Sequence, residues 1–362
     1  MSKNRLTVVI SQAPGKNPTK RALEESLAAH LLMEPGIDLS IVPHLYDLGP
    51  DHTGRLFLES VSGDLVVLAW LFPRASYWLL DRDGIKGREG SSPLHPKADE
   101  GDEDDSEEKP PEKAPGIGIA GEIPDRTIWC LDLRDKAGHE VFLTEVRRIA
   151  KVAAEERQQR VTAKPPPIIS LGLPGATAPS NGAVAPHTHE AANAKNTRKI
   201  LEPADLTPEK LLAPAGRRWY PVIDYSRCTN CLECLDFCLF GVYGVDGIDR
   251  IVVENQDSCK KGCPACSRVC PEQAIIFPDY KSPAIAGAPV GAIGGLKIDL
   301  SKLFGGDDAM KVAASERDRE LVRDGRDAVG LSVGIPKRQA EKSSAPKDEL
   351  DSLVDALDNL GI

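Results

Sequence analysis

The first 160 residues alternate between short apolar runs and longer segments in which apolar residues recur every three or four positions. Four runs rich in β-branched residues predict buried strands, at 5–11, 37–42, 64–72 and 126–133. Three segments with helical spacing predict helices with one buried face, at 19–33, 53–61 and 140–157. Because strands that alternate with helices favour parallel pairing, the pattern predicts a small α/β domain with a mainly parallel sheet over residues 1–160.

The first predicted helix carries a histidine among its apolar positions. Leu27, His30 and Leu31 fall on the same face of that helix. We therefore expect His30 to be a satisfied core residue and not a metal ligand.

Two short motifs in this domain share features with phosphate-binding loops. The loop at 11–18 contains Gly15 and Lys16 but lacks the leading glycine of a P-loop, so it predicts a structural turn. Residues 116–121, G-I-G-I-A-G, match the dinucleotide-binding pattern, but they follow an acidic tract and precede no helical pattern. We expect no nucleotide there. By analogy with open α/β sheets, a ligand would lie at the carboxyl ends of the strands, near the 11–18 loop and residues 44–52.

Two tracts of biased composition interrupt the chain. An insertion at about 90–120 contains the acidic stretch 96–115, which has no large apolar residue and is predicted to be disordered. Residues 161–214 are rich in Pro and Ala and predict a disordered linker that tethers the two folded parts. His187 and His189 lie in that linker, where an isolated pair makes a poor metal site.

The end of the chain, residues 283–362, predicts a loop and a helical tail. Helices are expected at 307–324 and 348–360. The second places four apolar residues at helical spacing, Leu350, Leu353, Val354 and Leu357. Such a stripe packs back on the body of the protein or docks in a partner's groove, and we favour packing back.

Eight of the nine cysteines lie between residues 228 and 270, in two similar runs. The first run has the spacing C-x2-C-x2-C-x3-C and comprises Cys228, Cys231, Cys234 and Cys238. The second has the spacing C-x3-C-x2-C-x3-C and comprises Cys259, Cys263, Cys266 and Cys270. Three pairs are 32 residues apart (263 − 231, 266 − 234 and 270 − 238) and one is 31 apart (259 − 228). The two runs are therefore an internal duplication with one residue inserted in the second copy.

This spacing suits a cubane iron–sulfur cluster, which takes one thiolate on each of its four irons. Three closely spaced cysteines on a tight loop can bind three irons, and the fourth, which starts a helical turn, points away to the other cluster. Cluster one would then have the ligands Cys228, Cys231, Cys234 and Cys270. Cluster two would have the ligands Cys259, Cys263, Cys266 and Cys238.

The cysteine pattern resembles that of the bacterial-type two-cluster 4Fe-4S ferredoxin family, over about residues 217–281. The resemblance implies an α+β ferredoxin-like module, placed at 215–282, and one-electron shuttling through two adjacent 4Fe-4S clusters. Strands of this module are expected at 217–228, 248–253 and 274–277. The dry shell around the clusters is expected to include Leu232, Phe237, Phe240 and Val269. Three cations are expected beside cluster two, to offset thiolate charge or to steer an acidic partner: Lys260, Lys261 and Arg268.

Two positions depart from the family pattern. Leu239 stands where the family usually has a proline, which ligates nothing. The residue inserted between Cys259 and Cys263 is more serious, because it changes the loop around cluster two. Gly262 can absorb the inserted residue by adopting a backbone angle that is closed to other residues.

Other uses of the cysteines explain the pattern less well. Disulfides need an oxidising compartment, and no targeting segment indicates one. Zinc could take Cys228 and Cys231 together with Cys263 and Cys266, but four cysteines at iron–sulfur spacing would then have no role. Cys130, outside both runs, is expected to be a free, buried thiol.

Composition narrows the classes of partner. The net charge of −10 and the pI near 5.3 argue against binding to nucleic acid or to anionic membranes, which need a basic face. The longest strongly apolar run, 65–72, is too short to span a bilayer. We therefore expect a cytoplasmic protein that is not inserted in a membrane.

The leading functional hypothesis is an iron–sulfur electron-transfer protein with redox proteins as partners. One alternative is an oxidoreductase whose N-terminal domain binds a cofactor or substrate fed by the clusters. Another is an interaction protein that metal only stabilises. Since no paired carboxylates, Ser/His/Asp set or strong nucleotide motif is present, an electron carrier or redox subunit is favoured over a stand-alone enzyme.

Overall fold

The computed structural model describes residues 5–95, 116–134, 138–162, 216–289, 304 and 307–334. The acidic stretch 96–115, the predicted linker from residue 163 onward and the predicted helix at 348–360 lie outside the described residues. The described residues fall into two compact units. The first takes those within 1–96, 122–217 and 246–250, and the second takes those within 97–121, 218–245 and 251–362.

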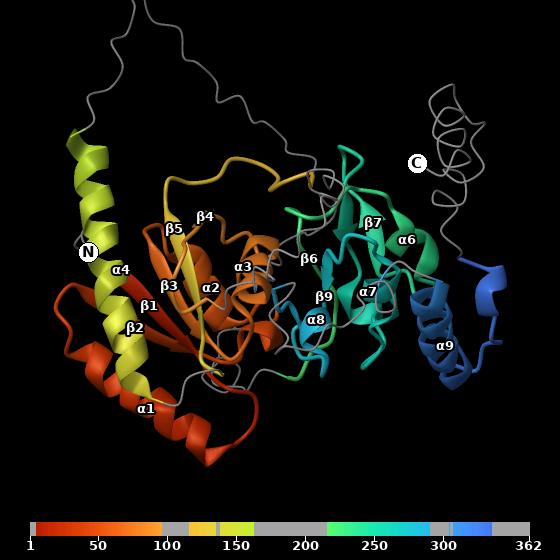
Figure 1. The fold of residues 1–362 in the computed structure, drawn as a ribbon, viewed down its shortest axis with the longest axis horizontal. Coiled ribbons are helices and arrows are strands. Elements are labelled where there is room, and N and C mark those ends of the chain that lie inside the picture. The colour runs from red at the N-terminus through yellow and green to blue at the C-terminus, as the bar shows by residue number, and fades with distance from the viewer. Residues whose placement is uncertain are drawn as a thin grey trace, which may run out of the picture. The chain divides into compact units, whose positions relative to one another are not determined.

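The first unit is built on a five-stranded sheet with the strand order β2-β1-β3-β5-β4, in which every pair is parallel. Its strands are β1 (Leu6–Ser11), β2 (Ile37–Val42), β3 (Leu65–Ala69), β4 (Arg88–Glu89) and β5 (Thr127–Asp132). In the central register, Val8 lies between Leu39 of β2 and Val66 of β3. The prediction of a parallel α/β domain is confirmed, and Figure 1 shows the sheet between its helices.

Helices cover both faces of this sheet (Figure 1). They are α1 (Pro18–Leu32), α2 (Thr53–Ser60), α3 (Pro73–Arg82) and α4 (His139–Thr162), with a short 3-10 turn at Leu45–Asp47. The helices α1 and α4 share one core with the sheet, in which Leu27 and Phe142 pack against Val8. At the start of α1 the Asn17 side chain accepts a hydrogen bond from the Lys20 amide, which satisfies one free amide of the first turn.

The helix α3 was not predicted. The apolar run at 64–72 was interpreted as a single strand, but β3 ends at Ala69 and a helix begins at Pro73, whose fixed φ suits a first helical position. Every residue from 75 to 81 of α3 is buried, including the polar Ser76 and Asp81, so the polar residues of this segment do not mark a face exposed to solvent.

A buried carboxylate ties α1 to the loop after β1. Glu24 is 3% exposed, and its Oε1 accepts hydrogen bonds from the Ala13 amide at 2.5 Å and from the Trp70 indole at 2.8 Å. Its other oxygen pairs with Arg21, which also donates to the Gly15 carbonyl. These bonds give the Ala13 amide and the Gly15 carbonyl partners from within the protein. The loop at 11–18 is therefore held as a structural turn, as predicted.

Cys130 lies in the middle of β5 and is buried, as predicted. Burial, together with the nearby charge of Glu89, raises the pKa of its thiol well above the ordinary value. We therefore expect Cys130 to resist iodoacetamide at pH 8 in the folded protein and to react once guanidinium unfolds it. Peptide mass spectrometry of the two samples tests this, and alkylation of Cys130 in the folded protein would contradict it.

The second unit contains two short antiparallel ribbons. Its strands are β6 (Val222–Ile223), β7 (Tyr243–Val245), β8 (Ile251–Val253) and β9 (Ile275–Ile276), and β6 pairs with β9 while β7 pairs with β8. The strands predicted at 217–228 and 248–253 are shorter than expected. Ile248, the first residue of the strand predicted at 248–253, instead lies in the turn before β8 and is 76% exposed.

The helices of this unit reproduce the sequence duplication. They are α6 (Glu233–Phe237), α7 (Ala265–Val269), α8 (Pro283–Ala286) and α9 (Asp307–Arg323), with 3-10 turns at Gln256–Ser258 and Gly330–Ser332. The bounds of α6 and α7 differ by 265 − 233 = 32 and 269 − 237 = 32 residues, the offset of the cysteines. The predicted helix at 307–324 is α9, and α8 lies in a segment that was expected to be a loop. Among the described residues, no helix is both long and apolar enough to cross a membrane.

Candidate metal centre

The eight cysteines of the duplicated runs line two separate cavities. One cavity is lined by Cys228, Cys231, Cys234 and Cys270. The other is lined by Cys238, Cys259, Cys263 and Cys266. Each cavity thus takes three cysteines from one copy and the fourth from the other copy. We call them cavity one and cavity two.

Short helices bring the cysteines to these cavities. Cys234 lies in α6 and Cys266 in α7, while Cys238 and Cys270 each follow the last residue of those helices with extended backbone. The helical turn was expected to start at the fourth cysteine, and that expectation is wrong. The turn ends there, so that the fourth cysteine leaves the helix and reaches the other cavity.

The glycine of the loop that contains the inserted residue adopts the backbone angle that was expected of it. Gly262 has a φ of +87°, in the left-handed region that favours glycine. Asn230, which precedes it by 262 − 230 = 32 residues, has a φ of 59°. Both copies therefore make the same left-handed turn just before a cysteine, and Asn is the non-glycine residue that tolerates it best.

Burial and repulsion between neighbouring cysteines raise the pKa of several of these thiols. Burial, with the neighbouring cysteines, raises the pKa of Cys234 and of Cys266 well above the ordinary value. Burial likewise raises the pKa of Cys263 to about 11 and that of Cys270 to about 12. A metal that binds these cysteines as thiolates must therefore displace the thiol protons. Its positive charge then offsets the repulsion between the neighbouring thiolates.

Two hydrogen bonds already point at the sulfurs. The Tyr243 hydroxyl donates to Cys266 Sγ at 3.1 Å, and the Ala274 amide donates to Cys270 Sγ at 3.3 Å. Donors of this kind stabilise the negative charge of a metal-bound thiolate. Four sulfurs in each cavity, five of the eight buried and three half-buried, fit a cubane iron–sulfur cluster, and four thiolates also fit zinc.

The apolar shell lies where it was expected. Phe237 and Val269 are buried and share a cluster with Cys263 and with Ala313 of α9. Phe240 lines cavity two and Leu232 lines cavity one.

The cations near cavity two differ from those expected. Of the three predicted from the sequence, Lys260 lines the cavity. Arg268 pairs with Glu316 of α9 at 3.0 Å. The second cation that lines cavity two is Arg317 of α9, which sequence reasoning missed. It lies 317 − 266 = 51 residues after the last cysteine of that cavity, and no local motif marks it.

Comparison with known proteins agrees with the cysteine pattern. The chain is 52% identical over 66 residues to an uncharacterized ferredoxin from Methanocaldococcus jannaschii, a match that covers 18% of this chain and 44% of that protein. The chain carries a ferredoxin-like segment. It spans less than half of the length of that relative, and the rest of the chain is not recognised. No family model and no solved structure matches the sequence.

A glycine-rich stretch from the predicted insertion packs against the ferredoxin-like segment, within the second unit. The Ile117 amide donates to the Cys228 carbonyl at 2.8 Å, and the Gly118 amide donates to the Tyr225 carbonyl at 2.9 Å. A Cβ on Gly116 would lie 2.2 Å from the Ser226 carbonyl oxygen, so only glycine fits this approach. Gly116, the first glycine of G-I-G-I-A-G, thus allows close contact with the loop of Cys228.

Replacing Gly116 with valine is expected to push this stretch off the Cys228 loop. If cavity one holds the expected iron–sulfur cluster, that cluster should then lose iron several-fold faster to a ferrous chelator, because the loop that carries Cys228 loses two hydrogen bonds. Absorbance of the chelate over time measures the rate. Gly216→Val is the control, since no heavy atom lies within 4 Å of a Cβ at that position. Equal rates in both variants would show that the contact does not protect the cluster.

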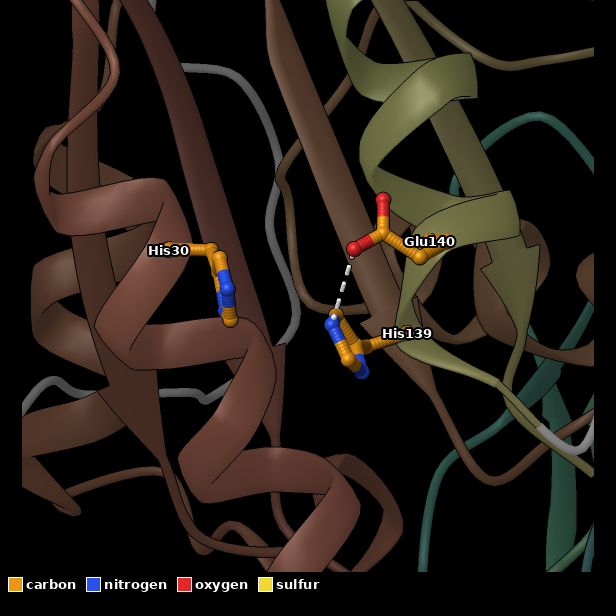
Figure 2. A group of neighbouring side chains, drawn as sticks. All are labelled: His30, His139 and Glu140. Atoms are coloured by element: carbon orange, nitrogen blue, oxygen red, sulfur yellow. Dashed lines mark ion pairs between the residues drawn. The ribbon is translucent and has the colours of Figure 1, made fainter.

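His30 does not lie in the core, and the expectation that it would is wrong. Its ring is exposed and stacks on His139 at 4.7 Å between ring centroids, as Figure 2 shows. His139 also pairs with Glu140 at 3.1 Å. Although these three residues could offer ligand atoms within 4.8 Å of one another, the two rings are nearly parallel and Glu140 lies in the first turn of α4. The helix dipole disfavours a cation there, so the group is better described as a surface contact between α1 and α4.

The first unit has a cleft of about 590 Å³ on the side of β4 and α4. Its charged residues are Arg88, Glu89, Arg148 and Glu156. Thr127, which begins β5, also lines it, so the cleft lies at the amino end of that strand. A ligand was expected at the carboxyl ends of the strands, and this cleft is a different place.

Proposed function

We propose that this protein is an iron–sulfur electron-transfer protein that carries two 4Fe-4S clusters and shuttles single electrons between redox proteins. Cluster one would be held by Cys228, Cys231, Cys234 and Cys270. Cluster two would be held by Cys238, Cys259, Cys263 and Cys266. The observation that carries the proposal is the presence of two separate four-cysteine cavities in a chain with a ferredoxin-like segment.

The residues of this chain would serve the clusters in three ways. The thiols lose their protons and bind iron as thiolates. The Tyr243 hydroxyl and the Ala274 amide donate to ligand sulfurs and stabilise the added negative charge. Phe237 and Val269 exclude water from the buried side of cavity two. When bound, the clusters supply one-electron chemistry, whose potential depends on burial, hydrogen bonds and charge.

The compartment proposed is the cytoplasm. All nine cysteines are free thiols in the structure. A reducing compartment keeps such thiols available for iron, whereas an oxidising one favours disulfides between neighbours.

A coulometric reductive titration of anaerobically purified protein tests the proposed function. We expect an uptake of about two electrons per chain, one for each cluster, with bleaching of the visible absorbance. The reduced protein should then return these electrons to a one-electron acceptor such as ferricyanide. Uptake of no electrons by a chain that contains its full metal would contradict electron transfer and favour structural zinc.

The alternative of an oxidoreductase gains some support from the cleft in the first unit. Its volume of about 590 Å³ is in the range of cofactor sites, and Arg88 and Arg148 could meet an anionic group. This alternative predicts a flavin or nucleotide in the purified protein. Mass spectrometry of the supernatant after acid denaturation tests it, and a supernatant without either compound leaves the electron carrier as the better account.

A further inference from the structure

The two cavities differ in the charge of the residues that line them. Among the described residues, cavity one is lined, besides its cysteines, by two carboxylates, Glu233 and Glu272, and by no lysine or arginine. Within the same part of the chain, cavity two is lined by two cations, Lys260 and Arg317, and by no aspartate or glutamate. Glu233 is 2% exposed and Arg317 is 1% exposed, so water screens neither charge well.

Arg317 is held firmly in place by the backbone around it. Its guanidinium donates hydrogen bonds to the carbonyls of Phe237 at 3.4 Å, Val333 at 3.0 Å and Gly330 at 2.5 Å. It also lies 4.5 Å from the centroid of the Phe237 ring, one residue before Cys238. Gly334 packs so closely that a Cβ there would lie 2.9 Å from the guanidinium. A buried cation with this many partners has a fixed position beside cavity two.

The acidic residues of α9 offset this cation only in part. Asp318 pairs with Arg317 itself at 3.2 Å and is more exposed, with 14% of its side chain accessible against 1% for Arg317. Glu316 and Glu320 also raise the pKa of Cys263, but each has its own arginine partner, Arg268 and Arg323. Lys260 pairs with Asp324 at 2.6 Å, and its side chain is 32% exposed. Arg317 is thus the least screened charge at cavity two.

We propose that cluster two has the higher reduction potential of the two clusters, and that Arg317 is the main residue that separates their potentials. The inference rests on the proposed function. Each electron adds negative charge to a cluster, so a buried cation stabilises the reduced state and a buried carboxylate destabilises it. An electron that enters the protein therefore rests on cluster two, and cluster one is the stronger reductant.

A redox titration of the full-length, cluster-loaded protein, followed by EPR, tests this proposal. The wild type should show two couples, and the higher one should survive in Cys234→Ala, which lacks cluster one. Arg317→Gln should shift the higher couple to a more negative potential and leave the lower one in place. Arg317→Lys, which keeps the charge, should shift it less. Lys311→Gln is the matched control, because that cation is on the same helix but 65% exposed, and it should shift neither couple.

Glu233→Gln provides the reciprocal test at cluster one, where it should move the lower couple to a more positive potential. If Arg317→Gln fails to hold cluster two, Asp318→Asn replaces it, because loss of the carboxylate that pairs with Arg317 should move the higher couple upward. Coincident couples in the wild type would overturn the proposal. A higher couple that is unchanged in both Arg317→Gln and Asp318→Asn would also overturn the proposal. Equal shifts in Arg317→Gln and Arg317→Lys would do the same. A wild type without any reducible couple would instead contradict the proposed function.

Discussion

Replacing Cys234 with alanine is expected to lower the iron content from about eight to about four atoms per chain. Cys234 is 8% exposed and lines cavity one with Cys228, Cys231 and Cys270. Without it one iron of cluster one has no thiolate, and the buried site has no other sulfur to offer. Cavity two has all four of its cysteines in this variant, so its cluster should remain.

Cys238→Ala makes this prediction sharper. Cys238 belongs to the first cysteine run, yet it lines cavity two, so its loss should remove cluster two and spare cluster one. In the redox titration, Cys234→Ala and Cys238→Ala should therefore each retain a different couple. Cys130→Ala, at the free thiol of β5, should retain all the iron. Full iron in Cys234→Ala, or the same remaining couple in both variants, would contradict the grouping of the ligands.

The second large effect is expected at Glu24, in the N-terminal domain. Glu24→Ala should lower the free energy of unfolding of that domain by about 2 to 4 kcal/mol, since it leaves two donors without their charged acceptor. The Ala13 amide and the Trp70 indole, which now donate to the carboxylate at 2.5 and 2.8 Å, would be left without their acceptor. Urea unfolding followed by Trp fluorescence measures the loss.

Glu24→Gln and Glu25→Ala are the controls for this substitution. The glutamine can keep an oxygen in the place of Oε1, which accepts from both donors, and should lose less stability than alanine. Glu25 is an exposed neighbour on the same helix, and its replacement should change stability by less than about 0.5 kcal/mol. Equal losses in Glu24→Ala and Glu25→Ala would show that the buried hydrogen bonds contribute nothing.

Local pattern was enough to predict most of the N-terminal sheet. The strands β1, β2 and β5 and the helices α1 and α4 have strong apolar periods or runs, and each formed within a few residues of its predicted bounds. The left-handed conformation of Gly262 was also expected from the sequence, but Asn230 adopts it in the first copy, which has no inserted residue, so the insertion is not its cause.

Features that depend on distant parts of the chain were not predictable. The helix α3 buries the polar Ser76 and Asp81 along with its apolar residues, and this burial depends on packing that the local sequence does not show. His30 was expected on the buried face of α1 because of its spacing from apolar residues. That spacing does not show where α4 lies, and His139, the first residue of α4, stacks on His30 at the surface. Arg317 reaches cavity two only because α9 packs on α7, a contact between segments far apart in the sequence.

The most direct test of the central claim is the content of iron and acid-labile sulfide per chain after anaerobic purification, with an EPR spectrum of the dithionite-reduced protein. Two cubane clusters predict about eight irons, about eight sulfides and a spin-coupled signal from two neighbouring clusters. About four irons would mean that one of the two cysteine-lined cavities does not hold a cluster. Zinc in place of iron, without a reducible signal, would contradict electron transfer by this protein.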